Sequence, residues 1–372
     1  MKLLSDIRSA RRWAVPLAAA ALLASSCSMI HEDLPECATR PATRASVNFI
    51  YDYNTLSQDL FNDNVGSVTL YVYDADNHLV SLSEFTAGQF RADGFAVPLS
   101  LPYGTYSLYA SARASEDGYE ASLLTPGAKF RRSAANPGDA FDALRYTLDN
   151  TNGAVDHASL PLEHMWLTQQ PVTLTLSEAE IPAEGAPQPA DVIVPATVPL
   201  QRVTNNLHLS ITRANSADAN LPALSDSDYE VWVQTVDGRH ELDLLGRPTA
   251  AAQPLRYTPY AVSTSSDKRA AASIEADIAM SRLILEEDAA KHTQLVVRSR
   301  LSGETFTWDL PELLARGREA YPSHEWSGQE YLDREYNYNL TVDFRESDEG
   351  WRYIEISIPI LNWAKRIQNV DL

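Results

Sequence analysis

The sequence predicts an all-β protein with two tandem β-sandwich domains and short helices in loops. Short segments in which apolar and polar residues alternate recur along most of the chain, and this period of two is typical of half-buried strands. Turn residues separate these segments, and no helical pattern extends beyond about two turns. The chain has 372 residues, which fits two domains at about 150 residues each.

In the first half of the chain, strands are expected at residues 68–73, 79–82, 103–110 and 172–176. The turn cluster at residues 74–78 joins the first two strands, so they are expected to form a hairpin. Residues 113–160 are rich in Ser, Asn, Asp and Gly. They predict long loops with a short helix near residues 139–144.

A proline-rich interval at residues 181–189 has no apolar period. It predicts a boundary between an N-terminal domain of residues 45–185 and a C-terminal domain of residues 186–372. A long hairpin loop is the alternative interpretation of this interval.

In the second half, strands are expected at residues 207–212, 231–236, 295–301, 304–310, 338–344 and 354–360. The dipeptides that end at Gly238 and Gly303 are hairpin signals. Pro359 cannot donate a hydrogen bond to a ladder, so the last strand is expected to reach a sheet edge at its far end. A short helix is expected at residues 311–316 and, from a weaker pattern, at residues 281–290.

The chain is acidic, because 30 lysines and arginines against 50 aspartates and glutamates give a formal net charge of −20. Binding to nucleic acid relies on Lys and Arg side chains that neutralise phosphate. The composition therefore argues against a nucleic-acid partner and indicates no other partner.

The N-terminus has the pattern of an export signal. Four basic residues precede an apolar stretch at residues 13–24, and small residues then lead to Cys27. The stretch is too short to span a bilayer as a helix, and no later apolar run approaches 18 residues. We expect residues 1–26 to be a signal peptide that is removed.

Cys27 follows the small residues directly, which resembles the processing box of bacterial lipoproteins, with Leu23 one position further from the Cys than usual. We expect a diacylglycerol on its sulfur and an acylated amino terminus, and several acyl chains hold a protein on a membrane. Cys37, the only other cysteine, then has no disulfide partner in the chain. A plain secretory signal is the alternative.

Residues 27–44 are expected to form a tether, and Arg44 is a candidate cleavage site for an Arg-specific protease.

No motif for catalysis is found, since the sequence has no HExxH, GxSxG, P-loop, GxGxxG or CxxC. His157 and His164 favour loop and strand-edge positions over a metal site, and the cluster at Asp74 lacks the Gly and Glu of a calcium loop. We expect no enzyme, no cofactor, no metal and no small-molecule substrate. Aromatic residues on strands more often belong to a core than to a sugar site. The candidates for sugar stacking are Trp166, Trp232, Trp308 and Trp326.

Three stretches of the sequence carry a family resemblance. The first comprises CSMIHEDLPEC at residues 27–37, FIYDYN at residues 49–54 and LYVYD at residues 70–74. The second, VPLQRVTN at residues 198–205, contains Arg202.

The third stretch is IPILNWAKR at residues 358–366, which contains Asn362, Trp363 and Arg366. Together the stretches resemble the fimbrillin-associated anchor proteins of Bacteroidales, the basal subunits of type V pili. The resemblance is dense at the two ends of the chain and weak in the middle.

The resemblance implies two transthyretin-like sandwiches in a palmitate-bearing, surface-exposed lipoprotein of the cell outer membrane that serves cell adhesion. Such a protein holds fimbriae to the cell and limits their length. Its partners are the fimbrial shaft subunit and accessory fimbrial subunits, bound by strand complementation, in which main-chain hydrogen bonds supply affinity. Residues 351–372 are the candidate edge strand, with Asn362, Trp363 and Arg366 as candidate assembly residues. Alternatively, these three pin the C-terminus to its domain.

Two other functions remain open. Within the same system, the chain is a shaft or tip subunit that an Arg-specific protease matures at Arg44. From a different class, it is a surface glycan-binding lipoprotein, which an exposed Trp on one face would favour.

Overall fold

The computed structural model describes residues 40–155, 157–181, 190–213, 224–251, 253–265, 272–300, 302–347, 350–360 and 363–369. Strands predominate and helices are short, which confirms the predicted all-β class. The chain divides into two compact units. One comprises Met1–Thr43 and Glu178–Val192, and the other Arg44–Ser177 and Ile193–Leu372.

In the first unit, the residues that precede the first strand are bonded to the flanks of the proline-rich interval. The backbone nitrogen of Ala42 donates to Asp191 Oδ1 at 3.2 Å, and that of Val192 donates to the Ala42 carbonyl at 2.8 Å. Arg40 and Glu178 form an ion pair. The end of the predicted tether is therefore held by residues far away in the sequence.

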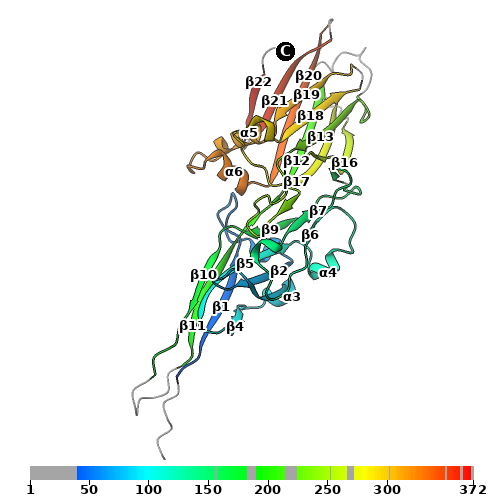
Figure 1. Ribbon diagram of the computed structural model, residues 1–372. Helices are drawn as coiled ribbons and strands as arrows, with labels where there is room; N and C mark the ends of the chain where they lie inside the picture. Colours follow the sequence, from blue (N-terminus) through cyan, green and yellow to red (C-terminus); the bar gives the residue numbers. More distant parts are fainter. Residues whose placement is uncertain are drawn as a thin grey trace, which may run out of the picture. The chain divides into compact units, whose positions relative to one another are not determined.

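An eight-stranded sheet has the order β3-β2-β5-β9-β11-β1-β4, with β10 paired to β5 (Figure 1). Its strands are β1 (Thr43–Ile50), β2 (Ser67–Tyr73), β3 (Leu79–Thr86), β4 (Val97–Leu99), β5 (Gly104–Arg113), β9 (Met165–Thr168), β10 (Val172–Leu176) and β11 (Val192–Arg202). The short helices of this part are α2 (Phe61–Asn64), α3 (Ala87–Phe90), α4 (Gly118–Ser122) and the 3-10 turn η1 (Phe141–Ala143).

The core of this sheet follows from the alternation of its strands. Val47 and Phe49 of β1 are buried, whereas the residues beside them are partly or fully exposed. The Phe49 ring lies 5.6 Å from the Phe61 ring, which in turn lies 4.8 Å from Phe90. Such tilted and offset aromatic pairs stabilise a core beyond the area they bury.

Strand β2 is buried along its whole length, although its alternation predicts a half-buried strand. Leu70 belongs to the core described above, while Tyr71 and Tyr73 belong to a second core on the opposite face. The Tyr71 and Tyr146 hydroxyl oxygens lie 2.7 Å apart. A three-stranded sheet covers this face, formed by β6 (Phe130–Arg132), β7 (Tyr146–Leu148) and β14 (Glu241–Leu242).

The remaining strands form two sheets, with the orders β16-β17-β12-β20-β21-β22 and β19-β18-β13-β15-β8 (Figure 1). The first contains β12 (Thr204–Arg213), β16 (Ala261–Ser265), β17 (Ser273–Ser281), β20 (Asn337–Ser347), β21 (Gly350–Ile360) and β22 (Trp363–Asn369). The second contains β8 (Ala154–Val155), β13 (Tyr229–Thr235), β15 (Leu255–Tyr257), β18 (Gln294–Ser299) and β19 (Thr305–Asp309). Helical segments here are η2 (Ala289–Lys291), α5 (Leu310–Ala315), η3 (Arg316–Ala320) and α6 (Gly328–Arg334).

These two sheets face each other across one hydrophobic core. The ring of Phe344 on β20 lies 5.2 Å from Tyr229 on β13 and 5.2 Å from Phe306 on β19. Leu209 of β12 has no exposed surface. Since β20 belongs to one sheet and β13 and β19 to the other, these contacts make the pair a sandwich.

Several local predictions are confirmed. Strands β2 and β3 form the expected hairpin, and β18 and β19 form another around Gly303, which has a φ of 74°. Helix α5 forms where a helix was expected, and the Asp309 side chain accepts a hydrogen bond from the backbone of Glu312 at its N-terminus. The helix expected near residues 139–144 is the single 3-10 turn η1.

Four further expectations are wrong. Residues 113–160, expected as long loops, contain the short strands β6, β7 and β8, of which β7 and β8 pair with distant parts of the chain. The chain turns at Gly238, but β14 then pairs with β7 instead of β13, so no hairpin forms there. Strand β21 is not at an edge, because the chain folds back as β22 and Pro359 lies opposite Ala364. No helix spans residues 281–290, since β17 continues to Ser281 and only the turn η2 follows.

The division into domains at residues 185 and 186 stays a prediction. After the proline-rich interval the chain returns to the eight-stranded sheet, where β11 pairs with β9 so that Leu200 lies opposite Thr168. The next strand, β12, belongs to the six-stranded sheet.

We expect Leu209→Ala to lower the free energy of unfolding by about 2–5 kcal/mol, because it leaves a cavity in a closely packed core. Leu124→Ala is the matched control, since Leu124 is 88% exposed, and it should change stability by less than about 0.5 kcal/mol. Urea unfolding of both variants measures the difference. Equal losses would contradict the sandwich core described above.

Candidate functional site

The predicted site residues lie at the two ends of the chain. Cys27 and Asn362 lie outside the described residues. Trp363 and Arg366 fall in β22, which is the edge strand of the six-stranded sheet within the described part. The lipidation and assembly roles of these residues stay predictions.

Arg44 is an exposed residue near the start of β1. The next residue, Ala45, is buried and pairs with Leu99 of β4. A protease binds its substrate as an extended chain. Because Ala45 is paired with β4, cleavage after Arg44 requires the start of β1 to separate from the sheet. The cleavage site itself stays a prediction.

Arg202 is buried at the end of β11, where the chain passes from the eight-stranded to the six-stranded sheet. Its Nε donates to the Thr204 carbonyl at 2.9 Å, and its guanidinium lies 4.1 Å from the Tyr336 ring and 5.6 Å from the Trp166 ring. Burial lowers the pKa of Arg202 to about 10. Arg202 is therefore charged at neutral pH, and aromatic faces from both parts of the fold stabilise it.

Two further arginines make contacts near the junction, the place where β11 of the eight-stranded sheet leads into β12 of the six-stranded sheet. Arg282 makes a two-pronged ion pair with the buried Asp333, with Nε–Oδ1 and Nη2–Oδ2 distances of 2.7 and 2.8 Å. Arg334 of α6 donates to the carbonyl of Asn54, after β1, and its guanidinium lies 4.3 Å from the Tyr53 ring. Charge-assisted, directional contacts of this kind fix the orientation of the groups they join.

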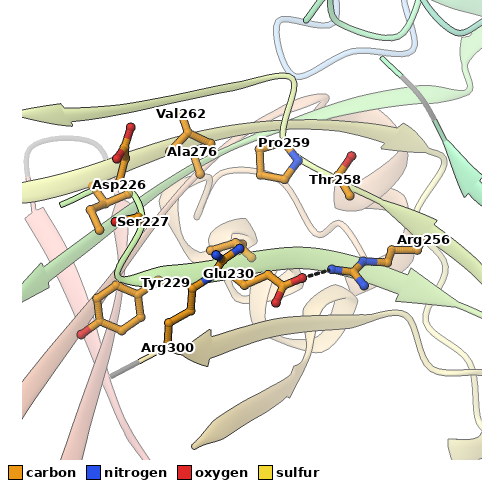
Figure 2. Close-up of a pocket in the computed structure, with 12 residues that line it drawn as sticks. Asp226, Ser227, Tyr229, Glu230, Arg256, Thr258, Pro259, Val262, Ala276 and Arg300 are labelled. Atoms are coloured by element: carbon orange, nitrogen blue, oxygen red, sulfur yellow. Dashed lines mark hydrogen bonds and ion pairs between the residues drawn. The ribbon is translucent and has the colours of Figure 1, made fainter. Parts of the chain in front are cut away.

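A pocket of about 420 Å³ lies where the chain crosses from the five-stranded to the six-stranded sheet (Figure 2). Apolar side chains from β13, β16 and β17 form part of its wall, and Glu230 and Arg256 form an ion pair of 2.8 Å beside them. The full lining consists of Asp226, Ser227, Tyr229, Glu230, Val231, Arg256, Thr258, Pro259, Val262, Ile274, Ala276 and Arg300.

The outer face of the five-stranded sheet carries a row of polar contacts around Trp232. The indole nitrogen of Trp232 donates to Gln234 at 3.0 Å, and the Gln234 amide donates to Gln294 at 2.7 Å. The Arg256 guanidinium lies 4.1 Å from the Trp232 ring. Sequence reasoning named Trp232 only as one of four tryptophans. Trp166 and Trp308 are buried, as expected of core residues.

The other candidates from the sequence lie in a turn or in an ion pair of the fold. Asp74 accepts hydrogen bonds from the backbone of Asp76 and His78, as in a hairpin turn. Glu163, beside His164, forms an ion pair with Arg113. Among the described residues, no three His, Cys, Asp or Glu side chains gather as a metal site. No helix in the described part of the chain is long and apolar enough to cross a membrane.

We expect His164 to make the fold acid-sensitive. Burial, and then the charge of Arg202, lower the pKa of His164 from 6.5 to about 4. As the pH falls from 6.5 to 4, the unfolded chain binds a proton that the folded protein does not, so stability is lost. His164→Asn should reduce this loss by about 1–3 kcal/mol, measured by urea unfolding at pH 7 and pH 4.5.

The same substitution at the exposed His78 serves as the control. Burial raises the pKa of the Glu335 carboxyl group, so Glu335 makes the folded protein more stable as the pH falls. This contribution is the same in the variant and the wild type, and the difference between them does not contain it. An acid loss in His164→Asn equal to that of the wild type would show that His164 does not titrate in this way.

Comparison with known proteins places the chain in one family. The fimbrillin-A associated anchor proteins Mfa1 and Mfa2 match residues 34–369. No match is found among curated proteins.

Solved structures share the fold. A candidate polysaccharide-binding protein from Bacteroides thetaiotaomicron is 23% identical with a TM-score of 0.64, over 88% of this chain and 98% of that one. A candidate adhesin from Bacteroides ovatus is 21% identical with a TM-score of 0.66, over 93% and 100%. The fimbrial anchor protein Mfa2 from Porphyromonas gingivalis is 16% identical with a TM-score of 0.52, over 87% and 98%. Because the family match covers most of the sequence, the chain belongs to the fimbrillin-A associated anchor proteins Mfa1 and Mfa2.

Proposed function

We propose that this protein is a lipid-anchored subunit of the outer membrane that holds type V fimbriae to the cell surface and limits their length. The observation that carries the proposal is the family match across residues 34–369. The protein acts through structure and adhesion, without catalysis. Its partners are the fimbrial shaft subunit and accessory fimbrial subunits.

Attachment to the membrane rests on Cys27. The sequence around it supports lipidation, and two or more acyl chains make an anchor far stronger than one chain alone. The lipid joins the folded body through the tether of residues 27–44, whose last two residues already belong to β1. The net charge of −20 repels anionic lipid surfaces, so covalent lipid is the physical basis for membrane attachment.

Binding to the shaft rests on the terminal hairpin. Strand β22 pairs only with β21 in the described part of the chain, from Ile354 opposite Asn369 to Ile360 opposite Trp363. An edge strand presents backbone groups that a partner strand can use. Residues 351–372 therefore supply the edge at which the shaft subunit docks.

A shaft or tip subunit matured at Arg44 is the nearest alternative. In that case, cleavage would remove the tether, including Thr43 and Arg44, the first two residues of β1. A glycan-binding role is the alternative of a different class, and the partly exposed Trp232 on the outer face of the five-stranded sheet is its candidate stacking residue. Binding on a glycan array that Trp232→Ala abolishes would support that role.

We expect Cys27→Ala to release the protein and its fimbriae from the membrane fraction, because the acyl chains are lost. Immunoblots of membrane and medium fractions measure the release. Ser28→Ala is the control and should leave both in the membrane fraction. N-terminal analysis of the wild type should find a blocked Cys27, whereas a start at Ala45 would identify a shaft or tip subunit.

We expect removal of residues 363–372 to abolish binding to purified shaft subunits, because β22 is lost. Removal of residues 370–372 alone is the control, since β22 ends at Asn369. Calorimetric titration measures binding, and circular dichroism checks that both truncated proteins are folded. Unchanged affinity in a folded protein without β22 would place the docking edge elsewhere.

A further inference from the structure

The five-stranded sheet has a gap in its strand pairing. Strand β18 pairs with β13 over residues 229–234, whereas β15 pairs with the other side of β13 at residues 233–235 only. The chain leaves this sheet after Tyr257 and enters the six-stranded sheet, where β16 pairs with β17. Glu230 and Val231 therefore lie beyond the end of β15.

Strand β16 forms the other side of this gap. It ends the six-stranded sheet within the described part of the chain, and all five of its residues are exposed. Native sheets protect their edges with charges, prolines or very short strands. The other three edges of the sandwich follow this rule, since β22 contains Lys365, β19 contains Asp309 and β8 has two residues. Strand β16, with the sequence AVSTS, does not.

Between these two edges lies the pocket of Figure 2. Val231, Val262, Ile274 and Ala276 supply apolar surface to it, and Val262 is 45% exposed. Its volume of about 420 Å³ is within the range of pockets that hold ligands. An apolar side chain that enters it would bury surface now in contact with water.

The charges of the lining select the occupant. Arg256 is already paired with Glu230 and stacked on Trp232. Arg300 extends along the side of the pocket that carries Tyr229 and Glu230 (Figure 2). Within the described residues, no ion pair to Arg300 is found, so a carboxylate of an incoming chain would complete it.

We propose that this β13–β16 groove, formed by Glu230 and Val231, the strand β16 and the pocket between them, binds an extended strand of another protein. The bound strand pairs through its backbone, places alternate apolar side chains in the pocket and directs one carboxylate to Arg300. The groove is at the opposite edge of the six-stranded sheet from β22. It is thus a second docking site, independent of the terminal strand in the proposed function.

A labelled nine-residue peptide tests the proposal. It alternates valine with threonine around a central aspartate, and a second peptide carries asparagine there. Fluorescence anisotropy with the purified mature chain should show saturable binding, about threefold to tenfold weaker for the asparagine peptide. Arg300→Gln should remove this difference. An absence of saturable binding up to about 1 mM would overturn the proposal.

Two valines provide matched variants. Val262→Lys places a charge in the groove and should weaken peptide binding at least about tenfold. Val192→Lys changes a valine of β11 that is 42% exposed, and it should change binding by less than about twofold. Equal effects of the two substitutions would show that the peptide binds elsewhere.

Two further outcomes would also contradict the proposal. The amide of Val231 points to the open side of β13, whereas that of Glu230 points to β18. If the amide of Val231 exchanges slowly with deuterium before peptide is added, the chain itself fills the groove. If the protein forms a dimer that Val262→Lys abolishes, the occupant is a second copy. Removal of residues 363–372 should leave peptide binding unchanged, which separates a failure of this proposal from a failure of the terminal-strand model.

Discussion

The buried guanidinium of Arg202 is the contact on which the arrangement of the sheets depends. It ends β11 at the place where the chain enters β12, and it touches Trp166 from the eight-stranded sheet and Tyr336 from the segment before β20. A charge removed from water is costly unless its surroundings compensate it. Here one backbone carbonyl and two aromatic faces do so, and each compensating group must keep its position. The charge thus ties the two parts of the fold to one geometry.

The contacts around Arg202 extend this constraint. Arg282 holds Asp333 of α6 with two hydrogen bonds, and Arg334 reaches back to the loop after β1. These contacts are directional, whereas hydrophobic burial is not. A polar junction of this kind resists sliding between the parts that it joins. It also places His164, whose pKa is lowered by burial and then by the charge of Arg202, beside the group that orders the junction.

The six-stranded sheet ends in two different edges. At one edge, β22 contains Lys365 and Arg366 and belongs to the terminal hairpin. At the other, β16 has no charge and borders a pocket. Edge strands pair readily with other chains, and the two proposed docking sites therefore lie at these two edges.

The sequence by itself determined the features that depend on near neighbours. Period-two alternation placed most strands, Gly303 marked a hairpin, and a short helix was located at residues 311–316, because these signals act within a few residues. The lipid attachment at Cys27 is likewise a prediction from local sequence. Only the tertiary structure decided which strands become neighbours. The turn at Gly238 leads to β7 instead of a hairpin, β2 is buried on both faces, and β15 leaves its sheet after three residues. These outcomes depend on partners far away in the chain, and so does the β13–β16 groove, because strand pairing and burial are set by contacts that no local pattern encodes.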